Sequence, residues 1–293
     1  MDGPDGHVSV GARVNVARQR LRDAGLPPEA ADLDARLIAQ HVLGWTTERF
    51  LTSADAPEPH GFAGNYEALI RRRSAREPLA YIVGHREFWG VDIEVTPAVL
   101  IPRPETEFLV ESLLAWFPDQ RAPILIADAC TGSGCVAIAI ARERPAGKVV
   151  ATDISDQALV VARRNAVRHG VAGRVHFVRT DLVRGIAGCF DAIVANPPYV
   201  PYCHRPVLES EVAHHEPGLA IFAGDDGLAA IERLVSQATD LIRHDGVLMF
   251  EFGFGQDDTI AGLISSTPGL ELIELRRDLQ DIPRIAIARR TAQ

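Results

Sequence analysis

The tetrapeptide Asn196-Pro-Pro-Tyr199 combines residue types that can hold a planar amino group. It directly follows residues 191–195, a short apolar run with β-branched members that predicts a buried strand. Two consecutive prolines cannot continue a hydrogen-bond ladder, so the chain must leave the sheet at Asn196. The asparagine amide offers two donors and an acceptor, the proline carbonyls are further acceptors, and the tyrosine adds a flat wall. We therefore expect a socket for a neutral NH₂ group, such as a carboxamide or a nucleobase amine; a simple strand-ending turn is the competing interpretation.

A second motif is the glycine-containing turn Cys130-Thr-Gly-Ser-Gly-Cys135, which follows an apolar run at residues 124–127. Gly132 and Gly134 let the backbone turn sharply and approach a ligand closely, which a Cβ atom would block. Ala137 stands where a dinucleotide fingerprint has its third glycine, and no lysine follows, which excludes a P-loop. The turn therefore predicts a ligand site that differs from both of these phosphate-binding motifs.

Acidic residues stand at or just after the ends of three predicted strands, at Asp128, Asp153 and Asp181. Asp153 is placed to accept hydrogen bonds from two ribose hydroxyls, and Asp181 could accept from an adenine amino group. Asp153 or Ser155 could instead cap the helix that follows. Three carboxylates suit a cofactor with hydroxyls and a cationic centre, which favours S-adenosylmethionine over NAD. We expect it to contact Asp128, Cys130, Thr131, Gly132, Ser133, Gly134, Asp153, Asp181, Leu182 and Asn196.

These side chains must be brought together by the strands that carry them. The apolar pattern predicts strands at residues 124–127, 149–152, 175–178, 192–195, 247–251, 272–275 and 284–288, and helices at residues 135–142, 156–169, 228–242 and 257–265. Near-continuous apolar strands that alternate with amphipathic helices are typical of a mostly parallel sheet covered on both faces. The carboxyl ends of such strands share one edge, where open α/β sheets bind ligands. The sequence thus predicts an α/β fold.

The N-terminal third has a different pattern. Residues 14–76 show helical spacing, interrupted by proline and glycine, and predict a small bundle. Its arginine run at residues 71–73 is typical of a solvated helix face, with a contact surface for a charged partner as the alternative. Residues 80–83 and 88–95 read as two short strands of a hairpin. We therefore expect a helical domain at residues 1–78, a β-hairpin linker at residues 79–103 and a larger domain at residues 104–293.

The composition is that of an ordinary globular protein: the 293 residues are 47% hydrophobic and 24% charged, with a net charge of −9. The acidic balance argues against a protein whose main task is to bind nucleic-acid phosphates. We find no signal peptide and no apolar stretch long enough to span a bilayer. The four cysteines form no C-x-x-C pair, and His214-His215 lacks the context of a zinc site. We therefore expect a cytoplasmic monomer with reduced thiols, no metal, no membrane partner and no stable nucleic-acid partner.

From about residue 77 to residue 289 the chain resembles the HemK/PrmC family, the peptide chain release factor glutamine N5-methyltransferases. The resemblance rests on Pro78-Leu-Ala-Tyr-Ile-Val-Gly84, Arg86-Glu-Phe-Trp-Gly90, Arg103-Pro-Glu-Thr-Glu107, Thr131-Gly-Ser-Gly134, Asn196-Pro-Pro-Tyr199, Glu216-Pro217 and Asp278-Leu-Gln-Asp-Ile-Pro-Arg284. It implies a Rossmann-like seven-stranded class I methyltransferase domain that uses S-adenosylmethionine, behind a helical domain that recognises the substrate. It also implies that the substrate is the glutamine of the Gly-Gly-Gln motif of a class 1 release factor.

Some positions depart from the pattern of that family. Cys130 stands where the family usually has glycine, and His215-Glu-Pro217 is similar to sister enzymes that methylate a glutamine of a large-subunit ribosomal protein. Arg103-Pro-Glu-Thr-Glu107 and the C-terminal motif are typical of the release-factor branch, which we favour. A nucleic-acid methyltransferase acting on the exocyclic amine of adenine or guanine is a further alternative, since a flipped base presents a similar planar amino group.

The nitrogen of a glutamine amide is a weak nucleophile, so the expected catalysis is positioning and desolvation. We expect the Asn196 side-chain oxygen and the Pro197 carbonyl to accept the two amide N–H groups and to stabilise positive charge that develops on the nitrogen. Tyr199, with Phe88 or Trp89, would wall the pocket, and no general base is assigned because the proton can leave to water. The residues expected to contact the substrate are Asn196, Pro197, Pro198, Tyr199, Phe88, Arg103 and Glu105.

Overall fold

The computed structural model describes residues 8–291. By the contacts between its elements, the chain divides into two compact units. Of the described residues, one unit contains those up to Gly84 together with Ser210–His215, and the other contains His85–Glu209 and those from Glu216 to Thr291. We refer to them as the helical unit and the sheet unit.

The helical unit contains α1 (Val10–Asp23), α2 (Pro28–Leu43), α3 (Thr47–Ser53), α4 (Phe62–Ser74), α5 (Leu79–Val83) and α9 (Ser210–His215). Its core is built from apolar residues at helical spacing, among them Leu21, Ile38 and Ile70. The Tyr66 hydroxyl is buried in this core and donates to the Ala35 carbonyl at 2.8 Å, which satisfies its polar end. The helices predicted for residues 14–76 are confirmed.

The strand predicted at residues 80–83 is wrong, because these residues form α5. Pro78 precedes the helix in an extended conformation, and Gly84 ends it with a φ of 86°. A proline before the first turn and a left-handed glycine after the last turn are typical helix boundaries. A short apolar run does not by itself distinguish a strand from a buried helical turn.

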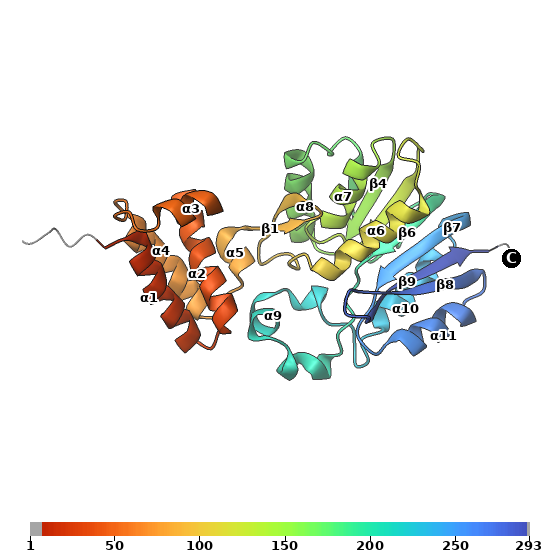
Figure 1. Cartoon of the computed structure of the whole chain (residues 1–293). Coiled ribbons are helices and arrows are strands. Elements are labelled where there is room, and N and C mark those ends of the chain that lie inside the picture. The colour runs from red at the N-terminus through yellow and green to blue at the C-terminus, as the bar shows by residue number, and fades with distance from the viewer. Residues whose placement is uncertain (1–7, 292–293) are drawn as a thin grey trace, which may run out of the picture. The chain divides into compact units, whose positions relative to one another are not determined.

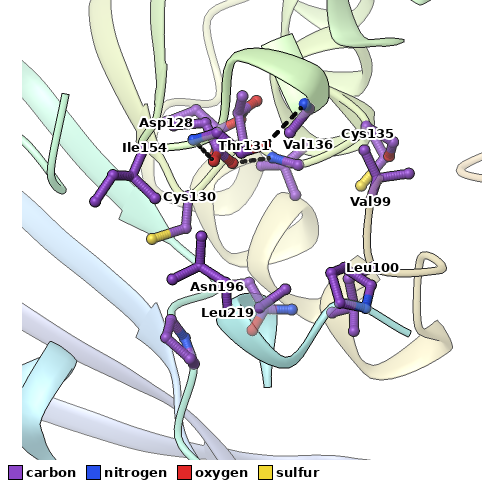
Figure 2. Close-up of a pocket in the computed structure, with 18 of the residues that line it drawn as sticks. Val99, Leu100, Asp128, Cys130, Thr131, Cys135, Val136, Ile154, Asn196 and Leu219 are labelled. Atoms are coloured by element: carbon purple, nitrogen blue, oxygen red, sulfur yellow. Dashed lines mark hydrogen bonds between the residues drawn. The ribbon is translucent and has the colours of Figure 1, made fainter. Parts of the chain in front are cut away.

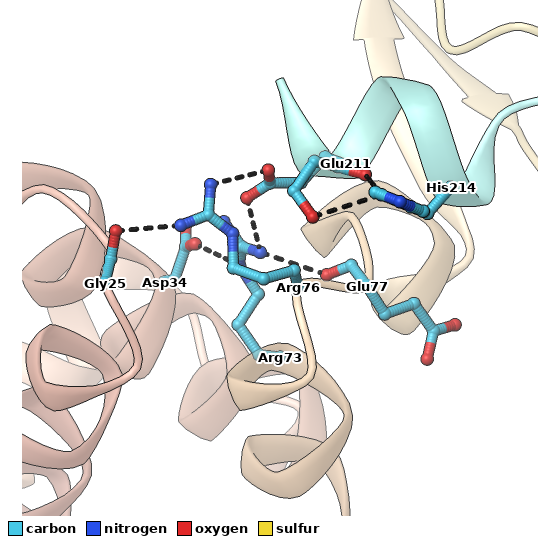
Figure 3. A network of polar contacts seen from close by, with 8 residues as sticks. Gly25, Asp34, Arg73, Arg76, Glu77, Glu211 and His214 are labelled. Carbon is cyan, nitrogen blue, oxygen red and sulfur yellow. Dashed lines mark hydrogen bonds and ion pairs between the residues drawn. The ribbon is translucent and has the colours of Figure 1, made fainter. Parts of the chain in front are cut away.

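A buried polar cluster attaches α9 to α2 and α4 (Figure 3). Arg73 Nε lies 2.6 Å from the Asp34 carboxylate, and Arg73 Nη1 lies 3.0 Å from the Glu211 carboxylate. Arg76 Nη2 donates to the second Glu211 oxygen at 2.7 Å. The segment between the Asn-Pro-Pro-Tyr motif and α10 (Ala229–Ala238) therefore contributes one helix to the helical unit.

The sheet unit begins with an antiparallel hairpin of β1 (His85–Phe88) and β2 (Val91–Glu94). Trp89 and Gly90 form its two-residue turn with φ angles of 52° and 67°. Positive φ angles at both positions are those of the turns that fit the twist of a hairpin. The continuous strand predicted at residues 88–95 is therefore wrong, since the chain reverses at Trp89 and Gly90.

The main sheet contains seven strands: β3 (Leu125–Ala129), β4 (Lys148–Asp153), β5 (Val175–Arg179), β6 (Phe190–Ala195), β7 (Ile242–Glu251), β8 (Leu270–Arg277) and β9 (Pro283–Arg290). Their order is β5-β4-β3-β6-β7-β9-β8, and only β9 runs antiparallel to its neighbours. The predicted seven-stranded, mostly parallel sheet is confirmed. The helix predicted at residues 228–242 ends earlier, at Ala238, because Ile242 pairs with Phe190 and already belongs to β7.

Helices cover both faces of this sheet (Figure 1). One face carries α6 (Glu107–Trp116), preceded by the 3₁₀ turn η1 (Pro104–Thr106), and also α7 (Cys135–Glu143) and α8 (Asp156–Arg168). The other face carries α10 (Ala229–Ala238) and α11 (Asp257–Ser266). The strand order reverses direction between β3 and β6, and such a switch point is where doubly wound sheets bind their ligands.

Candidate active site

A cavity of about 210 Å³ lies in the sheet unit at the carboxyl ends of the central strands. The side chains of Asp128, Cys130 and Asn196 are among those that line it (Figure 2). Of the residues predicted to act at the site, those that line it are Arg103, Asp128, Cys130, Thr131, Gly132, Ser133, Asp153, Asp181, Leu182, Asn196 and Pro198. The structure thus brings the two sequence motifs to one concave site.

The glycine turn between β3 and α7 forms one side of the cavity. Gly132 has a φ of 55°, and its amide donates to the Asp153 carboxylate at 2.9 Å. Gly134 has a φ of 82°, and a Cβ atom there would lie 3.1 Å from the Ala162 side chain. Gly134 is therefore needed for the close packing of α7 against α8, and Gly132 for the turn that faces the cavity.

Burial raises the pKa of the carboxylates on this side. Asp128 is 1% exposed, and its pKa rises to about 7 although it accepts a hydrogen bond from Thr131 at 2.5 Å. Burial also raises the pKa of Asp153, against the effect of backbone donors at Ser155 and Gly132. Desolvation disfavours the charged forms of both groups. A cation in the cavity would offset this penalty.

The two alternatives for the start of α8 are now resolved. The Ser155 side chain accepts from the Ala158 amide and caps the helix. The Asp153 carboxylate instead accepts from the Gly132 and Ser155 amides on the strand side of the cap. Asp181 forms an ion pair with Arg233, which also lines the cavity and was not predicted as a site residue.

The cavity thiols are unsuited to nucleophilic chemistry. Burial raises the pKa of Cys135 to about 12 and that of Cys130 further still, and the neighbouring carboxylates raise the Cys130 value as well. A thiol attacks as its thiolate, which these surroundings disfavour. The site combines carboxylates, a glycine turn and unreactive thiols. This combination fits a ligand that carries hydroxyls and positive charge.

The Asn-Pro-Pro-Tyr segment forms the other side of the site. Asn196 follows β6, and its Nδ2 atom donates to Thr106 Oγ1 at 3.0 Å. Thr106 Oγ1 donates to Glu251 Oε2 at 2.7 Å, and the Tyr199 hydroxyl donates to Glu251 Oε1 at 2.8 Å. Glu251 raises the pKa of Tyr199, because ionising the phenol would place a second negative charge beside the carboxylate. Sequence reasoning assigned no role to Thr106 or Glu251, although a glutamate that ends a buried apolar strand is an unusual residue.

Arg103 joins two loops beside the cavity by an ion pair with Glu216. The Glu216 side chain is buried and also accepts from the Ile101 amide at 3.1 Å. The residues that follow it, Pro217 and Leu219, line the cavity. The Arg-Pro-Glu-Thr-Glu and Glu-Pro motifs are therefore parts of one structural unit around the site.

Five predicted residues lie outside the lining of this cavity: Gly134, Pro197, Tyr199, Phe88 and Glu105. Phe88 is buried at the end of β1, and the Tyr199 ring packs against the core beneath the sheet edge. Among residues 8–291 there is no group of three or more His, Cys, Asp or Glu side chains that could hold a metal ion. Within the same range, no helix is long and apolar enough to cross a membrane.

Solved structures support the fold assignment. The chain is similar to the structure of the hMettl16 catalytic domain in complex with MAT2A 3′UTR hairpin 6, with a TM-score of 0.57 and 16% identity over 77% of this chain and 82% of that one. A methyltransferase from Pyrococcus furiosus gives a TM-score of 0.52 and 18% identity, over 78% of this chain and 100% of that one. At these identities the similarity shows a class I methyltransferase fold.

Sequence relatives are much closer. Residues 14–84 match the PrmC N-terminal domain, and residues 105–209 match the methyltransferase small domain. The release factor glutamine methyltransferase of Nitratidesulfovibrio vulgaris is 38% identical over 97% of this chain and 96% of its own length. That of Rhodospirillum rubrum is 41% identical over 93% of this chain and 82% of its own length. With both parts of the site in place and relatives that match along nearly the whole chain, the protein belongs to the family of release factor glutamine methyltransferases.

Proposed function

We propose that this enzyme transfers a methyl group from S-adenosylmethionine to the side-chain amide nitrogen (N5) of the glutamine in the Gly-Gly-Gln motif of class 1 peptide chain release factors. The observation that carries the proposal is the position of Asn196. Its amide lies on the lining of a cavity whose opposite side is the acidic glycine turn, and a hydrogen bond to Thr106 uses its NH₂ group. Its oxygen therefore remains to accept from a substrate.

The cofactor would be held by the turn from Asp128 to Gly134 and by Asp153, Asp181 and Leu182. When bound, it supplies an electrophilic methyl group on a positively charged sulfur. Asp153 suits ribose hydroxyls because its carboxylate is fixed by the Gly132 and Ser155 amides. Asp128 and Asp153 favour a cationic ligand because both are buried carboxylates without a cation among their hydrogen-bond donors.

In the proposed mechanism the chain acts on a weak nucleophile by holding it still. The Asn196 Oδ1 atom and the Pro197 carbonyl accept the two N–H groups of the glutamine amide and aim its nitrogen at the cofactor. Both acceptors stabilise the positive charge that develops on that nitrogen. Pro198 and Leu219 cover the site with apolar surface, which excludes water. The proton leaves to water after transfer.

The substrate is a protein, so further contacts lie beyond the cavity. We assign Arg103 and Glu105 to substrate contact, because they stand in the loop between the hairpin and α6. We assign substrate recognition to the helical domain, residues 1–78. Large-subunit ribosomal protein and the exocyclic amine of a nucleobase are the alternative substrates that an experiment has to separate from a release factor.

Mass spectrometry tests the assignment. Co-expression with a class 1 release factor should add a single methyl group to the glutamine of the Gly-Gly-Gln motif. The mass of that residue should rise by about 14 Da, the mass of one CH₂. Radiolabel from the methyl donor should not appear in ribosomal protein, DNA or transfer RNA. Label in any of these, with none in the release factor, would overturn the substrate assignment.

A substitution tests the site. Asn196→Ala should bind the cofactor with nearly unchanged affinity and lose most methyl transfer in single-turnover assays. Ser265→Ala is the control, since Ser265 is exposed on α11 and lies outside both the cavity lining and the helical domain. Near wild-type chemistry in Asn196→Ala would refute the role of the asparagine.

A further inference from the structure

We propose that Thr106 and Glu251 are positioning residues that fix the direction of the Asn196 amide, so that its oxygen and not its NH₂ group faces the substrate. The inference rests on the proposed role of Asn196 and names the residues that make this role possible. Three separate elements supply them: η1 carries Thr106, the end of β7 carries Glu251, and the end of β6 leads into Asn196.

The hydrogen bonds run from Asn196 to Thr106 and from Thr106 to Glu251, and the carboxylate of Glu251 decides the direction of both. An ionised carboxylate can only accept, so Glu251 Oε2 requires the Thr106 hydroxyl to donate its single proton at 2.7 Å. Thr106 Oγ1 then has only lone pairs left to offer. The Asn196 atom that lies 3.0 Å from it must be the NH₂ nitrogen, and Oδ1 points elsewhere. The carboxylate thus sets the orientation of an amide that it does not touch.

The second oxygen of the Glu251 carboxylate also accepts a hydrogen bond. Glu251 Oε1 accepts from the Tyr199 hydroxyl at 2.8 Å, so both of its oxygens are acceptors for hydroxyl groups. The charged groups that face it are Glu105 and Arg284, and Arg284 is itself paired with Asp278 at 3.1 Å. Burial raises the pKa of Glu251, and Glu105 adds to this rise. The hydrogen bonds from Thr106 and Tyr199 oppose it, as Arg284 does, so the two hydroxyl groups stabilise Glu251 as their acceptor.

The hydroxyl of Thr106 is not used to cap a helix. Thr106 directly precedes α6 with helical dihedral angles (φ −67°, ψ −19°), whereas a capping threonine is typically extended. Here the side chain makes no capping hydrogen bond, and α6 starts without one. The hydroxyl instead joins Glu251 to Asn196.

Burying the Glu251 carboxylate costs free energy, because burial disfavours its charged form, and the fold alone does not require a charged residue at this position. The side chain is 1% exposed at the end of the apolar run Val247-Leu-Met-Phe250, and burial raises its pKa. An apolar residue of similar volume at a buried position is often at least as stable as a charged one. A buried carboxylate whose two oxygens hold Tyr199 and Thr106 in place is explained by the site.

Without this arrangement the asparagine amide would be free to turn over. A reversed amide would direct two hydrogens at the two hydrogens of the substrate amide and repel it. Misplacement of a positioning group is expected to reduce kcat by about 10- to 100-fold. Cofactor affinity should change little, because neither Thr106 nor Glu251 was assigned to the cofactor.

The test uses the full chain, a class 1 release factor and a double-mutant cycle. Thr106→Val removes the hydroxyl and keeps the shape of the side chain, and we expect kcat to fall about 10- to 100-fold with a smaller change in KM. Thr106→Ser keeps the hydroxyl and should restore most of the lost kcat. In the Asn196→Ala background, Thr106→Val should cause no further loss, because Thr106 acts through the asparagine.

Glu251→Leu provides a second route, which remains informative if the Thr106→Val protein does not fold. Leucine accepts no hydrogen bond, so the Thr106 proton can turn toward Asn196 and favour the reversed amide. We expect a comparable loss of kcat with unchanged cofactor affinity. Wild-type kcat in a folded Thr106→Val or Glu251→Leu protein, or full additivity with Asn196→Ala, would overturn the inference. Activity retained by Asn196→Ala itself would instead overturn the proposed function.

Discussion

The buried carboxylate of Asp128 makes the stability of this protein depend on pH in a direction opposite to that of an ion-paired aspartate. The side chain is 1% exposed and its pKa is raised from 3.8 to about 7 by burial, with a further increase from Asp153. The folded protein therefore keeps this proton up to about pH 7, whereas the unfolded chain loses it near pH 4. Stability from this group is fully present below the unfolded pKa and is lost as the pH rises through the folded value.

The size of the effect follows from the interval between the two pKa values. An interval of about three units corresponds to at most roughly 4 kcal/mol, at about 1.4 kcal/mol per unit. Asp128→Asn cannot ionise and can still accept from Thr131, but it replaces one oxygen by a donor, which costs about 1 kcal/mol. The variant should therefore be slightly less stable than the wild type at pH 4 and more stable by about 2–3 kcal/mol at pH 8.

Urea denaturation of the cofactor-free protein between pH 4 and pH 8.5 measures this difference. Asp240→Asn is the matched control, since Asp240 is exposed after α10, and its curve should follow that of the wild type. A saturating cationic cofactor should reduce the advantage of Asp128→Asn at pH 8, because it favours the ionised wild-type carboxylate. Parallel pH profiles for Asp128→Asn and the wild type would refute the reasoning.

Two further substitutions test the contacts around the site and in the helical unit. Arg73→Ala should destabilise the protein by about 3–5 kcal/mol in thermal or urea unfolding, because it leaves the buried Asp34 and the half-buried Glu211 without their shared cation. Restoration of stability in the double variant Arg73→Met, Asp34→Leu would show that the unpaired charge is the cause. A loss below about 1 kcal/mol in Arg73→Ala would contradict this reasoning. Gly227→Ala should reduce kcat while the protein remains folded, since Gly227 has a φ of 80° and a Cβ atom there would lie against the Tyr199 carbonyl. The strain of about 1–3 kcal/mol would displace the chain just after the Asn-Pro-Pro motif. An unchanged kcat would show that this displacement does not reach Asn196.

The sheet could be predicted from the sequence because its signals are local. Most of the buried strands are runs of apolar residues, and β3, β4 and β7 are each followed by a helix with its own period, so the sequence places all seven strands within about five residues of their ends. The placement of Asn196 and Asp153 at one cavity could also be predicted, since both residues stand at the ends of strands whose carboxyl ends must share an edge. Local pattern and global fold agree there.

The failures lie where the local pattern is ambiguous or where the partner is distant in sequence. Residues 80–83 form a short apolar run that fits a strand or a helical turn, and the flanking Pro78 and Gly84 decide for the helix. Arg73 belongs to a run that is typical of a solvated face, yet it is 7% exposed because Asp34 and Glu211 surround it. Glu211 lies 138 residues further along the chain, which no spacing rule connects to α4. The same applies to Thr106 and Glu251, which meet only in the folded protein.

The charges around the cavity argue for the kind of substrate that such a site can accept. Its lining contains Asp128, Asp153 and Asp181, and the two arginines among the lining residues are each paired with a carboxylate, Arg103 with Glu216 and Arg233 with Asp181. Such surroundings attract a cationic methyl donor and repel a phosphate backbone, which needs unpaired cations to bind it. A neutral carboxamide meets no such repulsion, and the acceptors that we propose at Asn196 and Pro197 would match its two hydrogens. Electrostatics therefore favours a protein glutamine over a nucleobase for a pocket whose hydrogen-bonding groups would accept either.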